Sequence, residues 1–339
     1  MELHVSLGAR SYPIYIERGS LSRLSPRVNL ARKVLVVTDE GVPASLAQTV
    51  LSQCGQGFLE VLPMGEDSKS FSACERLCRR MLAENFTRKD LVLALGGGVI
   101  GDLSGFAASI YMRGIDFVNL PTTTLSQIDS SVGGKTAINF AGVKNIIGSF
   151  HQPRAVFLDA DAFATLPERH FVNGLAEAVK MGLILDPVIL DLFEREDWRD
   201  HVEEIIRRAV EKKARVVEAD ETEQGERKCL NFGHTIGHGI EAAGGLHGLL
   251  HGECVGLGML YFLEDPALRK RTVALLQRLV LPTRANVDPE KVYAALTHDK
   301  KGDASGVTVV VVDRPGHYRL ERMPYAELRA RVFAGVDGV

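Results

Sequence analysis

Five short apolar runs rich in β-branched residues alternate with helical patterns in the first half of the chain. The runs span residues 33–38, 58–62, 91–95, 117–120 and 155–158. Strands that alternate with helices form parallel sheets whose faces the helices cover. The alternation therefore predicts an α/β domain with a largely parallel sheet over residues 1–165. One of its helices is expected to begin at a capping box, Ser72-Ala73-Cys74-Glu75.

The pattern changes near residue 171. Beyond that point apolar residues recur at helical spacing, most clearly over residues 174–185, 188–193, 202–217 and 255–263. This periodicity predicts an all-helical second domain over residues 166–339. One β-like run at residues 307–312 and a last helix at 325–333 are assigned to its periphery. A cleft between the two domains is the default place for a ligand.

Charge and cysteine usage exclude several classes of function. The chain has 40 Lys and Arg against 43 Asp and Glu, a net charge of −3, so no basic excess draws it to nucleic acid or to a membrane surface. Its five cysteines contain no C-x-x-C pair, which favours free thiols in a reducing compartment. Neither a signal peptide nor an apolar run of roughly 18 residues is evident. We therefore expect a cytoplasmic protein.

Three glycines directly follow the third predicted strand, in the sequence Gly96-Gly97-Gly98-Val99-Ile100-Gly101-Asp102. The residues after them are compatible with a helix. A strand that delivers glycines to a helix N-terminus lets backbone N–H groups approach a diphosphate, and the helix dipole attracts the anion. The spacing differs from G-x-G-x-x-G, so a dinucleotide site and a purely structural tight turn both remain open at this point.

Polar and glycine residues are dense between residues 120 and 152. Among them, Lys135, Lys144 and Asn145 offer the point charges and the amide donor that suit phosphate oxygens. A phosphate or nucleotide contact and a solvated loop are the two interpretations. The segment Gly133-Gly134-Lys135-Thr136 resembles the end of a P-loop, but Asp129 occupies the position of the required glycine, which excludes a Walker A site.

Histidines in the second half have the spacing of metal ligands. His234 and His238 lie four residues apart on one face of a predicted helix, and His247 and His251 follow. Zinc ligation by His234 and His238 with a distant carboxylate is one interpretation, and ordinary hydrogen-bonded histidines are the other. The spacing does not decide which residue is the third partner.

Several charged residues have two interpretations each. Glu177 and Lys180 are one helical turn apart between apolar neighbours, which suits either a pair that faces a cleft or a solvated salt bridge. Arg113 and Arg227 are candidate anion contacts, although a single arginine is most often a surface charge.

Nine motifs can be read along the chain. They are GEDSK at 65–69, GGGVIGD at 96–102, YMRG at 111–114, PTTTLSQIDSSVGGKT at 121–136, KN at 144–145, GLAEAVK at 174–180, DETEQGER at 220–227, LNFGHTIGH at 230–238 and LHGE at 250–253. In kind and in order they resemble the 3-dehydroquinate synthase family of sugar-phosphate cyclases. The resemblance implies an NAD-binding α/β domain joined to a helical metal- and substrate-binding domain.

The resemblance also implies two cofactors, NAD and one divalent metal, usually zinc or cobalt. Glu177, His234 and His251 would bind the metal, and His238 would contact phosphate instead. The implied NAD contacts are Asp39, Glu66, Lys69, Gly98, Val99, Ile100, Gly101, Asp102, Thr122, Thr123, Asp129, Lys135, Lys144 and Thr165.

The implied reaction is the cyclisation of 3-deoxy-D-arabino-heptulosonate 7-phosphate to 3-dehydroquinate with release of phosphate. The residues implied around the phosphate are Lys135, Asn145, His238, Lys300 of the segment Asp299-Lys300-Lys301, and Arg113 of a neighbouring subunit. The last of these implies a homodimer. The residues implied at the carboxylate and ring hydroxyls are Lys180, Lys213, Arg227 and Asn231.

The sequence differs from the usual family pattern at two places, and two other functions are alternatives to the implied one. Ala141-Gly142-Val143 stands where the family more often has His-Pro-hydrophobic-Gly, and the segment after Gly302 is short. One rival is another sugar-phosphate cyclase, of the epi-valiolone or deoxy-inosose synthase type. The other is an iron-type polyol dehydrogenase, which would release NADH. Asn231, Lys300 and Lys301 favour the dehydroquinate assignment, because relatives tend to diverge at those positions.

Overall fold

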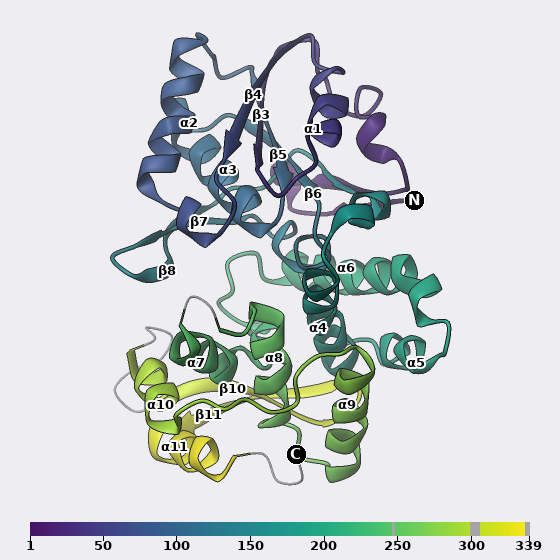
Figure 1. The fold of residues 1–339 in the computed structure, drawn as a ribbon, viewed down its shortest axis with the longest axis vertical. Coiled ribbons are helices and arrows are strands. Elements are labelled where there is room, and N and C mark those ends of the chain that lie inside the picture. Colours follow the sequence, from purple (N-terminus) through teal and green to yellow (C-terminus); the bar gives the residue numbers. More distant parts are fainter. Residues whose placement is uncertain (246–247, 299–305, 336–339) are drawn as a thin grey trace. The chain divides into compact units, whose positions relative to one another are not determined.

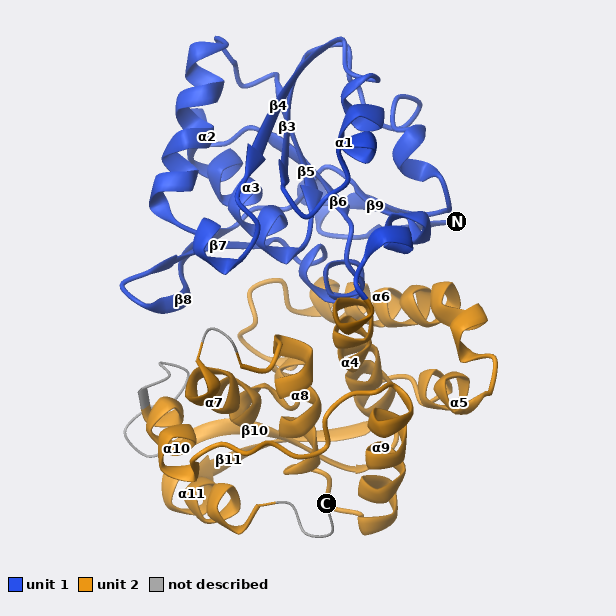
Figure 2. Ribbon diagram, viewed as in Figure 1, with its two compact units in different colours: residues 1–167 blue, residues 168–339 orange. Residues whose placement is uncertain are grey.

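The computed structural model describes residues 1–245, 248–298 and 306–335. The chain divides into two compact units, residues 1–167 and residues 168–339 (Figure 2). The division falls after Pro167, two residues later than the boundary expected from the sequence, which was after residue 165. Among the described residues, no helix is both long and apolar enough to span a lipid bilayer.

A seven-stranded sheet forms the centre of the first unit, with strand order β1-β2-β9-β6-β5-β3-β4 (Figure 1). The strands are β1 (Glu2–Val5), β2 (Tyr12–Ile16), β3 (Lys33–Asp39), β4 (Gln56–Leu62), β5 (Leu91–Gly96), β6 (Asp116–Pro121) and β9 (Val156–Leu158). The five strands expected from the sequence are confirmed, and they pair in parallel. The edge strand β1 and its neighbour β2 were not predicted.

Helices cover both faces of this sheet, as the sequence predicted. Helices α2 (Phe71–Ala83) and α3 (Gly98–Ile110) lie on one face, where they pack with Leu35, Val37 and Val92 in one core cluster. Helix α1 (Ala44–Leu51) lies on the other face and packs with the alternate residues of the same strands (Figure 1). Successive residues of a strand point to opposite faces, so strands that are covered on both faces are apolar at nearly every position.

The order of the strands locates a ligand crevice. From β3 the chain passes to β4 on one side of β3, and it then returns to β5 on the other side. The direction of winding therefore reverses between β3 and β5. In open parallel sheets, ligands bind at the carboxyl ends of the strands where this reversal occurs. Asp39 ends β3 and Gly96 ends β5, so both stand at this point.

One local prediction in this unit is wrong, and a segment that the sequence left open between two interpretations contains a hairpin. Helix α2 begins after Ser70 rather than at the expected capping box at Ser72, because the Ser70 hydroxyl accepts the hydrogen bond from the Ala73 N–H. The polar segment expected as a possible solvated loop contains an antiparallel hairpin of β7 (Lys135–Phe140) and β8 (Val143–Phe150). Most of β8 is exposed, so the strand lacks the hydrophobic alternation that would have identified it.

The second unit is mainly helical, with one β-hairpin. Its helices are α4 (Glu168–Ile184), α5 (Val188–Glu194), α6 (Val202–Ala219), α7 (His234–Gly244), α8 (His251–Leu260), α9 (Pro266–Arg278), α10 (Pro289–His298) and α11 (Tyr325–Ala334). Strands β10 (Gly306–Arg314) and β11 (His317–Pro324) pair antiparallel, so the expectation of an all-helical domain needs this correction. The β-like run at residues 307–312 is the inner strand of this hairpin, where buried valines pack against the helices.

Val280 gives a stability prediction for this unit. It follows the last turn of α9 in the left-handed conformation, with φ of 57°. The Leu281 N–H donates to the Leu276 carbonyl at 2.8 Å and the Val280 N–H to the Gln277 carbonyl at 2.9 Å, the bonds of a Schellman motif. The Val280 side chain is 79% exposed, so it contributes little packing.

We expect Val280→Gly to raise the free energy of unfolding by about 1 kcal/mol in urea, since glycine adopts this conformation without a Cβ clash. Val188→Gly is the matched control, because Val188 is an exposed residue at the start of α5 and glycine should lower stability there. A Val280→Gly protein that is less stable than the native one would contradict the assignment.

Candidate functional site

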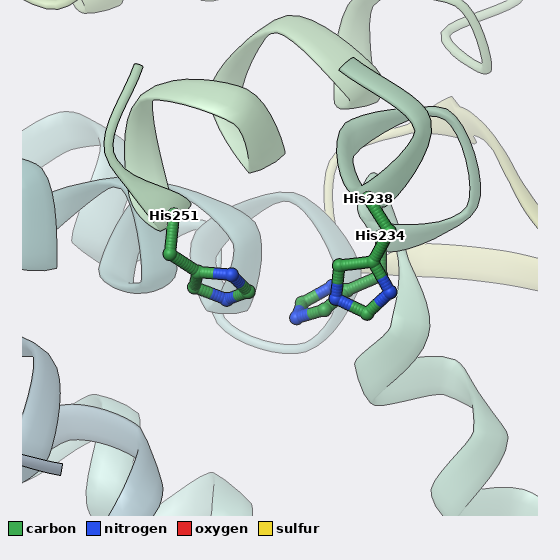
Figure 3. A group of neighbouring side chains, drawn as sticks. All are labelled: His234, His238 and His251. Carbon is green, nitrogen blue, oxygen red and sulfur yellow. The ribbon is translucent and has the colours of Figure 1, made fainter. Parts of the chain in front are cut away.

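Three histidines of the second unit come together. His234 and His238 belong to α7 and His251 is the first residue of α8. One ring nitrogen from each can be chosen so that all lie within 4.8 Å of one another. Figure 3 shows that the three rings point toward one another from the two helices. The spacing of His234 and His238 on one helix face is therefore confirmed, and His251 is the histidine that α8 adds to them.

A buried carboxylate from a third helix joins this cluster. Glu177 of α4 is fully buried, and its Oε1 lies 3.6 Å from His234 Nε2 and 3.5 Å from His251 Nε2. Donor atoms around a tetrahedral zinc ion with bonds of about 2.0–2.1 Å are about 3.3 Å apart. The two spacings are close to this value, and the donors are the histidine and carboxylate types that zinc and cobalt accept. The residues present therefore fit a divalent metal.

In two of the histidines, the ring nitrogen that is not directed at Glu177 has a hydrogen-bond acceptor. His234 Nδ1 donates to the Phe232 carbonyl at 3.1 Å, and His251 Nδ1 donates to Glu241 Oε2 at 3.2 Å. Metal-binding histidines usually make such an outer hydrogen bond, which selects the tautomer and orients the ring. Without a metal, burial disfavours the charged form of His251, but Glu177 and Glu241 outweigh burial and raise its pKa to about 9. A divalent cation would replace that proton.

Sequence reasoning missed Glu241. It lies three residues after His238 and seven after His234, so helical periodicity places it on the same face of α7 as both. That spacing was available in the sequence, but its significance depends on α8, which brings the His251 ring beside it.

Glycines allow the three helices to approach closely enough to form the cluster. A Cβ added to Gly258 of α8 would lie 2.0 Å from the Gly233 carbonyl oxygen, directly before α7. A Cβ on Gly237 would lie 2.9 Å from the Cys254 carbonyl oxygen, and one on Gly252 would lie 1.9 Å from the Asn173 carbonyl oxygen on α4. Only glycine fits at such contacts. Helix α8 therefore packs directly against the backbones of both partner helices.

Glu177 also pairs with Lys180. The two side chains form an ion pair one turn apart on α4, and both are almost completely buried. The interpretation as a solvated surface pair is therefore wrong, because the apolar residues around the pair belong to the interior. A buried ion pair costs desolvation energy, so it is weak support for stability.

Further polar residues of this unit are organised by the segment that follows α6. The Asp220 carboxylate accepts hydrogen bonds from the N–H groups of Gln224 at 2.9 Å, Gly225 at 2.7 Å and Arg227 at 3.1 Å. Burial alone would raise the pKa of Asp220, but these three hydrogen bonds together outweigh it and hold the pKa below its usual value. The Arg227 guanidinium in turn donates to the Glu221 carbonyl.

Besides Lys180, two more sequence-predicted cations are buried in this unit. Lys213 of α6 is 5% exposed and Arg227 is 2% exposed. The interpretation of Arg227 as a surface charge is therefore wrong. Asn231, at the end of the same segment, donates its amide hydrogen to Glu223 Oε1 at 2.5 Å. Glu223 has a φ of 62°, a conformation that residues other than glycine rarely adopt, and such residues cluster at functional sites.

In the first unit, the glycine turn lies at the reversal point of the sheet. Gly97 is the N-cap of α3, and the turn packs tightly, because a Cβ on Gly96 would lie 2.8 Å from Ile100 and one on Gly98 would lie 3.1 Å from the Ser130 hydroxyl. At the neighbouring strand end, burial raises the pKa of Asp39 above its usual value. Close packing therefore explains why glycines occupy this turn. The turn also has the geometry that binds a nucleotide phosphate at a helix N-terminus.

A polar network connects this helix to two distant motifs. The Lys69 ammonium donates to Asp102 of α3 and to Asn145 of β8. Asn139 donates to Glu66 Oε1 at 2.8 Å and accepts from the Asn145 N–H at 2.9 Å. Burial raises the pKa of Asp102, and the Lys69 charge opposes that shift. The network therefore gathers four sequence-predicted site residues at the N-terminal half of α3.

The remaining predicted site residues are distributed as follows. Thr122 and Thr123 directly follow β6, and Asp129 lies in a short helical turn, Ser126–Ser130. Lys135, Lys144, Thr165 and Arg113 are exposed, in β7, in β8, and in short helical turns at Ala160–Thr165 and Tyr111–Arg113. His247 and Lys300 lie outside the described residues.

Comparison with known proteins identifies the family. A family model described as 3-dehydroquinate synthase N-terminal matches residues 59–173, and one described as 3-dehydroquinate synthase C-terminal matches residues 174–302. The chain belongs to the 3-dehydroquinate synthase family. The two models meet at Asn173, within α4, and together they include Glu177 and the three histidines of the cluster.

Curated relatives extend this similarity to most of the chain. The 3-dehydroquinate synthase of Rhodospirillum rubrum is 45% identical, over 94% of this chain and 91% of its own length. The 3-dehydroquinate synthase of Streptococcus suis is 37% identical, over 97% of this chain and 98% of its own length. The resemblance read from the nine sequence motifs is therefore confirmed.

The fold is shared with a different sugar-phosphate cyclase. The structure of 2-epi-5-epi-valiolone synthase from Streptomyces hygroscopicus, with NAD+ and Zn2+ bound, has a TM-score of 0.87 and 27% identity, and the match covers 97% of this chain and 98% of that one. The α/β unit followed by a largely helical unit is thus an architecture that this chain shares with a synthase named for a different product. Fold alone does not identify the substrate of a chain.

Proposed function

We propose that this chain is a 3-dehydroquinate synthase, which converts 3-deoxy-D-arabino-heptulosonate 7-phosphate into 3-dehydroquinate and phosphate. The observation that carries the proposal is the cluster of Glu177, His234 and His251 in a chain that is 45% identical to a curated 3-dehydroquinate synthase. The carbon–oxygen bond to phosphate breaks and no net oxidation occurs, so the enzyme would be a carbon–oxygen lyase.

The two cofactors would occupy different units. Glu177, His234 and His251 would hold one zinc or cobalt ion in the second unit. NAD would bind in the first unit, at the end of β3 and the N-terminus of α3. The proposed contacts there are Asp39, Glu66, Lys69, residues 98–102, Thr122, Thr123, Asp129, Lys135, Lys144 and Thr165. When bound, NAD would accept a hydride from the substrate and later return it, and the cation would lower the pKa of the hydroxyl that is oxidised.

Cationic side chains would bind the two anionic ends of the substrate. Lys180, Lys213 and Arg227 are buried cations, and burial strengthens their attraction for a carboxylate because water screens it less. Asn231 would donate a hydrogen bond to a ring hydroxyl. We assign the phosphate to Lys135, Asn145, His238, Lys300 and Arg113 of a second copy of the chain, whose charges would stabilise the leaving phosphate as it forms.

The proposal includes a homodimer and a cytoplasmic location. Arg113 is exposed, so its side chain is accessible to a second copy of the chain. The five cysteines are free thiols, which suits a reducing compartment.

The deciding experiment supplies purified protein with the heptulosonate phosphate, NAD and Zn2+. We expect release of one phosphate per substrate, 3-dehydroquinate as the product, and no lasting absorbance from reduced nicotinamide. Accumulation of NADH without phosphate release would instead indicate a polyol dehydrogenase. Phosphate release only from a different sugar phosphate would indicate another cyclase of the valiolone type.

Arg113 gives a test of the phosphate assignment. We expect Arg113→Ala to raise the KM for the heptulosonate phosphate by about 10- to 100-fold, since a charged hydrogen bond of about 1.5–3 kcal/mol is lost. NAD affinity should change by less than about twofold. Arg79→Ala is the control, because Arg79 is an exposed arginine of α2 in the same unit. Equal losses for substrate and NAD would contradict the assignment.

A further inference from the structure

We infer that Glu241 is a positioning residue for the metal centre: it holds the His251 ring so that Nε2 faces Glu177, and it thereby raises the affinity for a divalent cation. The inference rests on the proposed function for the identity of the metal ligands. It concerns cation binding, which can be measured without substrate.

The two ring nitrogens of His251 have different surroundings. Nε2 lies 3.5 Å from Glu177 Oε1, and Nδ1 lies 3.2 Å from Glu241 Oε2. A carboxylate only accepts hydrogen bonds, so Nδ1 carries the hydrogen in the contact with Glu241. In the neutral ring the lone pair is then on Nε2, on the side of Glu177. Glu241 thus selects the tautomer that ligation from Nε2 requires.

His251 needs such a partner more than His234 does. The corresponding acceptor for His234 is the Phe232 carbonyl, two residues away in the same backbone, so its position is set by the local chain. His251 is the first residue of α8 and its side chain is 30% exposed. Glu241 lies on α7. Its contact with His251 therefore links the ring of a ligand on α8 to α7, the helix that carries His234.

Charge supports the same role. Glu177 is fully buried beside the Lys180 ammonium, which offsets much of its negative charge. The Glu241 side chain is 17% exposed, so its charge is only partly screened by water. A carboxylate on the outer nitrogen of a metal-binding histidine raises the basicity of the inner nitrogen and strengthens its bond to the cation.

The experiment compares Glu241→Ala and Glu241→Gln with the native protein, first freed of metal. Zinc affinity is measured by competition with a chromophoric chelator, and the visible spectrum of bound Co2+ reports the geometry of its ligands. We expect Glu241→Ala to weaken zinc binding by about 10- to 100-fold and to change the cobalt spectrum. Glu241→Gln keeps an acceptor oxygen but loses the charge, so it should restore part of the affinity.

Two readouts separate this role from a structural one. NAD affinity and the melting temperature of the metal-free protein should be the same in the variants and the native protein. Glu196→Gln is the control for loss of a carboxylate, because Glu196 is exposed and lies between α5 and α6. Its zinc affinity should equal that of the native protein. If Glu241→Ala does not fold, the isosteric Glu241→Gln carries the test.

The outcomes decide the inference. Native zinc affinity in both Glu241 variants would overturn it, as would a fall in zinc affinity that is matched by a fall in NAD affinity and melting temperature. A native protein that binds zinc but releases no phosphate would refute the proposed function and leave the role of Glu241 intact. A native protein that binds neither zinc nor cobalt would refute both.

Discussion

Replacing His251 with alanine is expected to abolish turnover and to remove bound zinc. His251 Nε2 lies 3.5 Å from Glu177 Oε1, and an alanine side chain has no atom that can bind a metal ion. Removal of an outer partner of a metal ligand costs about 10- to 100-fold in affinity or activity, so removal of the ligand itself should cost more than about 100-fold. Zinc per protein after gel filtration and the rate of phosphate release are the measurements.

NAD binding should be unaffected in the His251→Ala protein, because the proposed NAD contacts Asp39, Lys69 and the glycine turn belong to the first unit. His317→Ala is the control histidine, since His317 is exposed in β11 and pairs with Asp313. It should retain full zinc content and activity. Stoichiometric zinc in the His251→Ala protein would contradict the assignment of His251 as a ligand, and it would indicate His238 as the ligand in its place.

Gly258→Ala is expected to have the largest effect on stability. The added Cβ would lie 2.0 Å from the Gly233 carbonyl oxygen and 2.7 Å from the Gly237 nitrogen, and both are backbone atoms that cannot turn aside. Helices α7 and α8 would have to separate. Overpacking of this kind typically costs about 1–3 kcal/mol and occasionally more, and we expect about 3 kcal/mol or more here. Urea unfolding and zinc affinity are the measurements, and both should fall.

Gly256 provides a matched control in the same helix. Its nearest atoms are side-chain carbons of Leu276 at 3.4 Å and 3.8 Å, so an added Cβ meets ordinary contacts. Alanine has the higher helix propensity by about 1 kcal/mol, so Gly256→Ala should be neutral or slightly stabilising. If both alanine variants have native stability, then α7 and α8 do not pack as closely as the structure shows.

The core of the fold was predictable because its signals are local. Strands β3, β5 and β6 are covered on both faces, so each is a continuous apolar run that can be read directly from the sequence. Strand β8 could not be read in this way, since most of its side chains are exposed and pairing with β7 is what makes it a strand. The start of α2 was misplaced, because Ser70 and Ser72 are chemically equal candidates for the N-cap and the backbone conformation selects Ser70.

The site was predictable only in part. Helical periodicity places His234 and His238 on one face of α7, but it cannot identify which third residue completes the cluster. Glu177 and His251 are on other helices, and only the resemblance to a known family singled them out. Burial also decided between interpretations of single charges. The sequence left Lys180 and Arg227 open between a binding role and a solvated surface position, and both are buried in the structure, as is Lys213.

The sequence by itself determined the class of the fold, the family and the types of residue at the site, because these depend on patterns that extend over a few helical turns or strands. The tertiary structure alone decided which side chains meet. Glu177, His251 and Glu241 come from three helices, and their distances depend on how closely glycines let those helices pack. Such distances are set by contacts between segments far apart in the chain, and local spacing carries no information about them.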